Sequence, residues 1–214
     1  LDGLTNQTVR VLAVAPATST TIYAGTDTGI YRSTDSGTNW ASLGVGLANV
    51  NVRALALHPA APIYAGTLGG VFRSLNGGTN WSAFNTGLSN LTVNALLIQS
   101  NAPLTLYAGT AGGVFRSLNG GTNWTRLNTG LTTSNVLCLA MDPATPETIY
   151  AGTTNGLFKS LNGGAEWANV TSGGLAAPYV LAVAIDPAAP TTLYAGTKGT
   201  AFFGGSDGYV AKFG

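Results

Sequence analysis

Two arginines occupy matching places in the chain and are the side chains best suited to hold a ligand. Arg10 is the second residue of VRVLAV, and Arg53 is the second residue of VRALAL. The same place holds Asn94, Leu137 and Leu181 in three later segments of this kind. A guanidinium can bind a carboxylate or a sulfate through two parallel hydrogen bonds. The alternative is that both arginines cap the fold and donate to carbonyls of neighbouring linkers.

Hydrolysis of glycosidic bonds would require a different set of side chains. Two carboxyl groups must face one bond, about 5–10 Å apart. The chain has eight acidic residues, so the question is which of them the fold brings together. The single cysteine, Cys138, excludes an internal disulfide and a multi-cysteine metal site, and its apolar surroundings predict a small core residue. We therefore expect no cofactor and no metal.

Composition excludes several classes of partner. Only 8% of the residues are charged and the formal net charge is +1, so no basic face is available for nucleic acid. No stretch approaches the roughly 20 apolar residues of a membrane helix. The first residues, LDGLTNQTV, carry neither region of a signal peptide, and a surface rich in Thr, Ser and Asn favours a secreted protein, extracellular or periplasmic, from which the signal peptide is missing.

A regular repeat supplies the elements that must position these residues. YAGT recurs at Tyr23, Tyr64, Tyr107, Tyr150 and Tyr194, with spacings of 41, 43, 43 and 44 residues. A period of about 40–45 residues is typical of propeller blades or helical repeats. The short Val-, Ile- and aromatic-rich runs between turns exclude helices. We predict an all-β propeller, a single domain of five four-stranded antiparallel blades at approximately 1–43, 44–85, 86–128, 129–171 and 172–214.

The strands of each blade are named a to d in chain order. Strand a is nearly continuous in apolar residues, as expected of a strand covered on both faces by neighbouring sheets. It is predicted at Val9–Pro16, Val52–Pro59, Val93–Ser100, Val136–Pro143 and Val180–Pro187. The fifth unit departs from the others after its YAGT. Its last runs, Ala201–Phe203 and Tyr209–Phe213, are predicted to end the chain on a strand d.

One polar segment ending in tryptophan is repeated four times. SLNGGTNW occurs at 74–81 and 117–124, with near copies at 33–40 and 160–167. We call these segments the repeated octapeptides and expect each to turn the chain from strand c to strand d. The third residue can accept bonds from local N–H groups, the glycines permit positive φ, and the tryptophan fills the gap between sheets. The residues with this structural role are Ser33, Asp35, Gly37, Trp40, Ser74, Asn76, Gly78, Trp81, Ser117, Asn119, Gly121, Trp124, Ser160, Asn162, Gly164 and Trp167.

The octapeptide and the segment before it resemble a known repeat. The pattern is similar to the Asp-box, or BNR, repeat, which occurs in sialidases, xyloglucan-cleaving glycosidases, the sortilin family and photosystem assembly factors. It reads S-x-D-x-G-x-x-W and follows YAGT-x-x-G-(V/I/L)-(F/Y)-(R/K)-S. Asp35 keeps the acid, whereas Asn76, Asn119 and Asn162 replace it. The resemblance implies a β-propeller. It implies little about function, because enzymes and non-enzymes both carry the repeat at the blade periphery.

In such a propeller the b–c turns and the linkers entering strand a surround one mouth of the channel, which is a common place for a ligand. The candidate ligand-binding residues at this mouth are Arg10, Asp27, Arg53, Asn94, Asn155, Tyr179 and Lys198, within a wider set that includes Asp2, Asn51 and Asn135. Only Asp2 and Asp27 among the acids belong to this face. The remaining acids, predicted in turns elsewhere, are Asp35, Asp142, Glu147, Glu166, Asp186 and Asp207. No residues are assigned a catalytic role.

The sequence favours a non-catalytic extracellular binding or scaffold propeller, with a glycan or a protein as ligand. One alternative is a glycoside hydrolase of the sialidase or xyloglucanase kind, or a fragment of one. Another is an engineered or reconstructed propeller without a specific function, because Tyr64–Leu88 and Tyr107–Leu131 are nearly identical. No nucleic acid or membrane is expected as a partner.

Apolar end blades predict a closed, monomeric ring. An open arc would expose sheet faces larger than the few hundred Å² that soluble monomers tolerate, and a weakly charged chain has little repulsion to prevent association. Light scattering at micromolar concentration should therefore give the mass of a single chain. A stable dimer or larger assembly would contradict closure by one chain.

Overall fold

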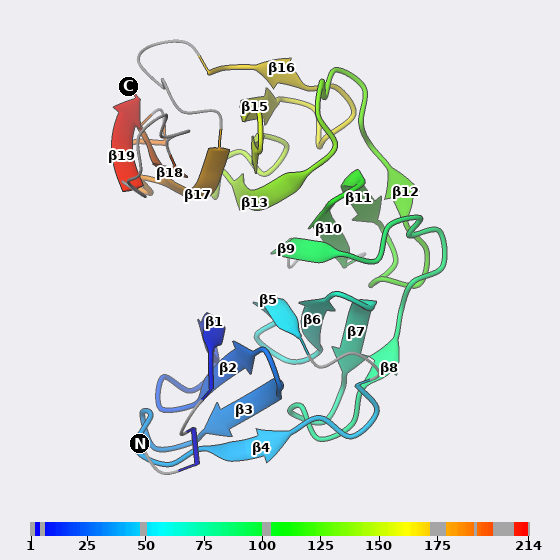
Figure 1. The fold of residues 1–214 in the computed structure, drawn as a ribbon, viewed down its shortest axis with the longest axis vertical. Helices are drawn as coiled ribbons and strands as arrows, with labels where there is room; N and C mark the ends of the chain where they lie inside the picture. The colour runs from blue at the N-terminus through cyan, green and yellow to red at the C-terminus, as the bar shows by residue number, and fades with distance from the viewer. Residues whose placement is uncertain are drawn as a thin grey trace. The chain divides into compact units, whose positions relative to one another are not determined.

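The structure is a computed structural model that describes residues 3–4, 7–47, 51–99, 104–171, 179–190, 192–198 and 208–213. These residues form nineteen β-strands joined by turns, and no helix occurs among them. The strands assemble into five antiparallel sheets, each made from consecutive segments of the chain (Figure 1). The five sheets are the blades predicted from the period of the repeat.

Strand a forms where the apolar runs predict it. Branched and aliphatic side chains favour the extended backbone, and each run is followed by a turn. The five strands a are β1 (Val9–Val14), β5 (Val52–Leu57), β9 (Val93–Gln99), β13 (Val136–Met141) and β17 (Tyr179–Ile185). The prediction is thus confirmed to within two residues at either end.

Strands b and c form a tight hairpin around each YAGT segment. Strands b are β2 (Ile22–Thr26), β6 (Ile63–Thr67), β10 (Thr105–Thr110), β14 (Ile149–Thr153) and β18 (Leu193–Lys198). The first four strands c are β3 (Gly29–Ser33), β7 (Gly70–Ser74), β11 (Gly113–Ser117) and β15 (Gly156–Ser160). The YAGT threonine closes each of these four turns, because its Oγ1 donates to the carbonyl of the first glycine of strand c at 2.8–3.0 Å.

Strand d is short in the four blades where the described residues include one. These strands are β4 (Ala41–Leu43), β8 (Ser82–Ala83), β12 (Thr125–Arg126) and β16 (Ala168–Asn169). Short outer strands leave little unpaired backbone at the blade edge, which limits pairing with other chains.

The fifth sheet corrects one prediction. It contains three described strands, in the order β17-β18-β19, and β19 is Gly208–Phe213. Because β19 pairs with β18 from Lys198↔Gly208 to Leu193↔Phe213, it occupies the place of strand c rather than strand d. This blade has no octapeptide to turn the chain into an outer strand. Ala201–Phe203 lies outside the described residues.

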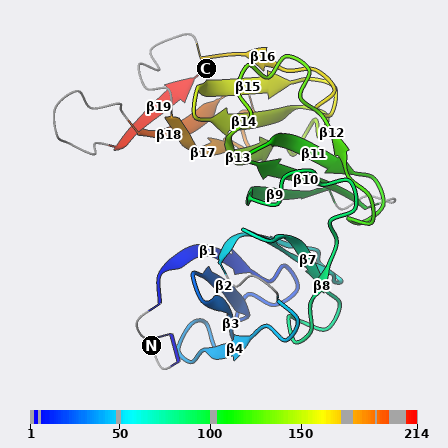
Figure 2. The same cartoon turned by 45° about the vertical axis from the view of Figure 1, so that its right-hand side comes forward.

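Contacts divide the chain into two compact units. Unit 1 contains Leu1–Ala108 and Ser117–Trp124, and unit 2 contains Gly109–Arg116 and Thr125–Gly214. Blades 1 and 2 belong to unit 1 and blades 4 and 5 to unit 2, whereas the strands of blade 3 are shared between them. Within unit 2, Figure 2 shows β13, β14 and β15 side by side in one sheet.

The glycine of YAGT leaves a space that a valine of the next blade fills. We call this space the notch. An ideal Cβ on this glycine would lie 2.6–2.8 Å from Cγ1 of the first valine of the following strand a, a distance that real Cβ atoms do not reach. The pairs are Gly25 with Val52, Gly66 with Val93, and Gly152 with Val180. All three valines are completely buried. Blades 1, 2 and 4 therefore fix the start of the next strand a by steric fit.

A second set of contacts joins blades at the octapeptide. Tyr23 and Arg32 both donate to the carbonyl of Gly77, at 3.3 and 3.2 Å, and Arg116 donates to the carbonyl of Gly163 at 3.3 Å. Tyr64 and Arg73 donate in the same way to the carbonyl of Gly120. In blade 4 the cation is Lys159, which lies 5.4 Å from the centre of the Tyr150 ring. The three arginines of strand c thus connect their blade to the next one, whereas Lys159 contacts a ring of its own blade.

The octapeptide itself is held by side-chain hydrogen bonds to its own backbone. In 74–81, Gly78 N donates to Ser74 Oγ at 2.9 Å, and Asn80 N donates to Asn76 Oδ1 at 2.9 Å. The other three copies repeat both bonds at 2.9 Å. Asp35 and the three asparagines accept in the same position, so the turn needs an acceptor oxygen rather than a charge.

Two of the tryptophans tie their turn to the preceding blade, and the other two donate within their own octapeptide. Trp81, Trp124 and Trp167 are buried, whereas Trp40 is partly exposed. The indole N–H groups of Trp124 and Trp167 donate to the carbonyls of Phe84 and Leu127 at 2.8 and 3.0 Å.

The notch can be tested in unit 2, which contains a matched control. Gly152→Ala should lower the free energy of unfolding by about 1–3 kcal/mol, because the new methyl group would overlap Val180 and Cys138. Gly196→Ala should be nearly neutral, since its Cβ would meet only the Cβ of Ala182, at 3.6 Å. Urea unfolding of both variants measures the difference. Equal losses would contradict the packing argument.

The carboxylate of Asp35 in the first octapeptide allows a second test, of the hydrogen bonds that hold the turn. Hydrogen bonds from the Asn39 backbone, the Ser33 hydroxyl and the Asn39 side chain lower the pKa of Asp35 to about 2. An unfolded Asp has a pKa of about 3.9, so this stabilisation is present above that pH and is lost as the pH falls through the folded pKa. Asp35→Asn should keep the turn, because Asn76 forms the same turn in blade 2. It should remove this contribution to the pH dependence of the free energy of unfolding.

Urea midpoints of the wild type and Asp35→Asn between about pH 5 and pH 2 measure this effect, over the interval between the two pKa values. An identical pH dependence in both proteins would show that the Asp35 hydrogen bonds contribute nothing to folding.

Candidate functional site

The b–c turns and the linkers entering strand a lie at the same end of the sheets. In blade 1 the N–H of Asp27 donates to the carbonyl of Thr8 at 3.2 Å. In blade 4 the N–H of Thr154 donates to the carbonyl of Asn135, also at 3.2 Å. We call this end of each blade the strand-a rim. Its turns stand on rigid strands, so side chains here can serve binding without building the core.

The second residue of strand a is a bulge at this rim. The pairing of strands a and b shifts register between Val9 and Val11 and at the equivalent place in blades 2, 4 and 5. The bulged residues are Arg10, Arg53, Leu137 and Leu181, and Asn94 has the same place in β9. A bulge interrupts the in-out alternation of a strand and redirects one side chain. This position can therefore vary while the valine before it stays in the notch.

In blade 1 the bulged arginine forms an ion pair. Arg10 Nε donates to Asp27 Oδ1, and Arg10 Nη2 donates to Asp27 Oδ2 at 3.0 Å. Asn51, in the linker before β5, donates through Nδ2 to Asp27 Oδ1 at 2.9 Å. The carboxylate is thus held by groups from two blades.

In blade 2 the bulged arginine continues this chain of bonds. Arg53 Nε donates to Asn51 Oδ1 at 3.4 Å, and Arg53 Nη1 donates to Asn94 Oδ1 at 2.9 Å. Arg10, Asp27, Asn51, Arg53 and Asn94 form one continuous array, which we call the rim network. Both arginines bond to side chains rather than to the linker carbonyls of the capping alternative. All five residues belong to unit 1.

The rim network fixes the charge of its only carboxylate. Hydrogen bonding from Arg10 is the main cause that lowers the pKa of Asp27, and Asn51 adds to it. The side chains of Arg10 and Asp27 remain 42% and 31% exposed, so this is a surface group in contact with solvent. A carboxylate with a lowered pKa is ionised at neutral pH and is poorly suited to donate a proton as a general acid.

The other three candidates lie in unit 2. Asn155 is exposed in the β14–β15 turn, where its N–H donates to Thr153 Oγ1 at 3.0 Å. Tyr179, 39% exposed, stands opposite Lys198 in the pairing of β17 with β18. The rim of unit 2 therefore presents a phenol, an ammonium and an amide in place of arginines. Asp2, from the wider set, lies outside the described residues.

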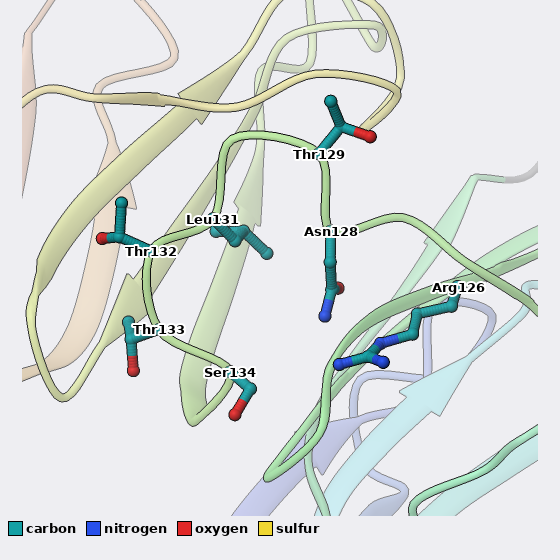
Figure 3. Close-up of a pocket in the computed structure, with 7 residues that line it drawn as sticks. All are labelled: Arg126, Asn128, Thr129, Leu131, Thr132, Thr133 and Ser134. Atoms are coloured by element: carbon teal, nitrogen blue, oxygen red, sulfur yellow. The ribbon is translucent and has the colours of Figure 1, made fainter.

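A cavity that the sequence did not predict lies beside β12. It has a volume of about 540 Å³ and is lined by Arg126, Asn128, Thr129, Leu131, Thr132, Thr133 and Ser134, which come from β12 and the loop after it (Figure 3). Asn128 is committed to the fold, because it accepts from Val114 N at 3.0 Å and donates to the carbonyl of Gly112 at 3.1 Å. The Thr- and Ser-rich composition of this loop was the available signal, but it is equally typical of an ordinary linker.

The remaining reactive side chains have structural surroundings. His58 Nδ1 accepts from Ala60 N at 3.2 Å, in the turn after β5. Burial raises the pKa of Cys138 to about 12, so its thiol is unreactive at neutral pH. Across the described residues, no three His, Cys, Asp or Glu side chains gather as a metal site, and no helix is long and apolar enough to span a membrane.

Comparison with known proteins identifies the fold. No protein-family model and no curated protein matches the chain. Among solved structures, the GH74 xyloglucanase from Xanthomonas campestris superposes with a TM-score of 0.77 at 19% identity, over 97% of this chain and 36% of that one. The extracellular domain of a one-component system from B. thetaiotaomicron gives 0.74 at 16% identity, over 92% and 26%. YCF48 bound to D1 peptide gives 0.65 at 20% identity, over 91% and 62%.

These similarities show the fold and leave the activity open. The chain is a β-propeller of five blades, similar in structure to GH74 enzymes, to the extracellular domain of a one-component system and to YCF48. It spans about a third or less of the xyloglucanase and of the B. thetaiotaomicron protein. At this level of identity, function must be argued from this chain's own site.

Proposed function

We propose that this propeller is a non-catalytic binding module and that the rim network is its contact surface. The observation that carries the proposal is the network itself. Five polar side chains from three successive blades hold one another in fixed positions at the ends of rigid strands. Preorganised polar groups lose little entropy when a ligand binds, which is the property that a recognition surface needs.

The repeated octapeptides support the assignment of a scaffold. We propose that they are Asp-boxes, with the serine and the acid or amide folding the turn and the tryptophan anchoring it. Their bonds are directed at their own backbone and at the neighbouring blade, so they build the propeller and leave recognition to the rim. An extracellular or periplasmic location fits the similarity to an extracellular domain.

Glycoside hydrolysis is the second candidate function, favoured by the structural similarity to GH74 enzymes. Among the described residues, however, Asp27 is the only carboxylate at the strand-a rim. Arg10 and Asn51 both donate to its oxygens. Because an acid and a second carboxylate are both required, the rim favours binding over hydrolysis.

A paired binding and hydrolysis experiment tests the proposal. Glycan and peptide arrays should show ligands for the wild-type chain, and Asn51→Ala should weaken that binding about tenfold or more, because it disconnects Asp27 from Arg53. His58→Ala is the control, since His58 follows the opposite end of β5. Xyloglucan and aryl glycosides should remain intact.

Two results would contradict the proposal. Equal binding by Asn51→Ala and the wild type would place the contact surface elsewhere. Hydrolysis of xyloglucan or of an aryl glycoside that Asp27→Asn abolishes would establish the enzyme instead.

A further inference from the structure

The fold does not require an arginine at the bulge of strand a. The same register shift occurs in blades 4 and 5, where the bulged residues are Leu137 and Leu181. A leucine therefore satisfies the backbone geometry as well as Arg53 does. The charge of Arg53 needs another explanation.

Arg53 differs from Arg10 in what balances its charge. Arg10 pairs with Asp27, and this is the ion pair found in the part of the chain that the structure describes. Among the described residues, Arg53 donates only to the amide oxygens of Asn51 and Asn94. Neutral amides satisfy hydrogen bonds without neutralising a cation. The rim network thus contains two cations and one anion.

The guanidinium of Arg53 also has donors to spare. An arginine carries five N–H donors, and the bonds to Asn51 and Asn94 use one from Nε and one from Nη1. Within the described residues, the Nη2 group has no acceptor. The two amides hold the guanidinium in place and leave the two N–H groups of Nη2 and one N–H group of Nη1 for a ligand.

The chemistry of this position favours a carboxylate. Two parallel N–H groups match the two oxygens of a carboxylate, and such charge-assisted pairs are stronger than neutral ones. A single unbalanced cation also suits a single negative charge. Asp27, linked to Arg53 through Asn51, would repel a doubly charged phosphate more strongly.

The surroundings favour a polypeptide over an acidic sugar. Sugar rings pack their C–H faces on exposed aromatic rings, and every described aromatic residue of unit 1 is buried or only partly exposed. The carboxylate of a Glu or Asp side chain needs no such ring, because it reaches a guanidinium on its own flexible stem.

We propose that the ligand of the rim network is an acidic polypeptide and that Arg53 receives one of its side-chain carboxylates. This rests on the proposed function and specifies its ligand. Asp27 then has a second effect besides orienting Asn51, because it occupies Arg10 and keeps that arginine from the ligand. Removing the charge of Asp27 should strengthen carboxylate binding.

The experiment follows the arginine side-chain N–H signals of the isotopically labelled chain by NMR. The probes are the capped pentapeptide Gly-Gly-Glu-Gly-Gly and the same peptide with Gln in place of Glu. The Glu peptide should shift the Arg53 signal saturably, with a dissociation constant of about 1–10 mM, as for a single charge-assisted pair. The Gln peptide should leave it in place.

Two variants make the result specific. Arg53→Leu introduces the residue that blades 4 and 5 carry at this bulge, so the fold is retained, and it should abolish binding of the Glu peptide. Asp27→Asn should bind the Glu peptide about tenfold more tightly, because it frees Arg10. Unchanged urea midpoints would verify that both variants are folded.

Several outcomes would overturn the inference. These are equal shifts with both peptides, undiminished binding by a folded Arg53→Leu variant, and no shift with either peptide. Tighter binding of a glucuronate disaccharide than of the Glu peptide would assign an acidic glycan instead. If Asn51→Ala still abolishes array binding in any of these cases, the proposed function stands and only the acidic polypeptide fails.

Discussion

The insertion of a valine into the notch of the preceding blade is the constraint on which the rest of the structure depends. A glycine in the middle of strand b is costly by itself, because it adds flexibility and contributes no side chain. Here it is required, since Val52, Val93 and Val180 occupy the space of the missing Cβ. This contact fixes where β5, β9 and β17 begin and therefore where the rim of each of these blades must lie. The period of the repeat is the period of this contact.

Fixing the valine leaves its neighbour unconstrained. The notch holds the first residue of strand a, and the bulge moves the second residue out of the sheet alternation. Core packing therefore requires a valine in the notch, whereas the bulged residue after it can change with function. This explains why valine recurs at the first place, whereas Arg53 and Leu137 stand at equivalent second places. The same geometry that repeats the fold allows each blade a different chemistry at the rim.

The sequence could predict the blades but only part of the site. Tyr64, Gly66 and Trp81 have counterparts in the same order in each of the first four units, so their repetition identifies the strands and turns. The pairing of Arg10 with Asp27 could not be read in the same way, because it depends on which side chains face each other across a turn. The bulge was also invisible, since a register shift leaves the apolar pattern almost unchanged. In blade 5 the missing octapeptide was visible, yet its consequence, β19 in the place of strand c, required the observed pairing with β18.

The neutral partners of Arg53 show how a nearly uncharged protein can acquire specificity. With 8% charged residues, little long-range field is available to attract or orient a ligand. Selectivity must then come from short-range geometry, in which the amides of Asn51 and Asn94 position a guanidinium without cancelling its charge. An acidic residue in place of either asparagine would hold Arg53 equally well, but it would neutralise the positive charge that an anionic ligand needs. The choice of amides over carboxylates at these two positions is therefore what separates a recognition group from a structural ion pair such as that of Arg10 with Asp27.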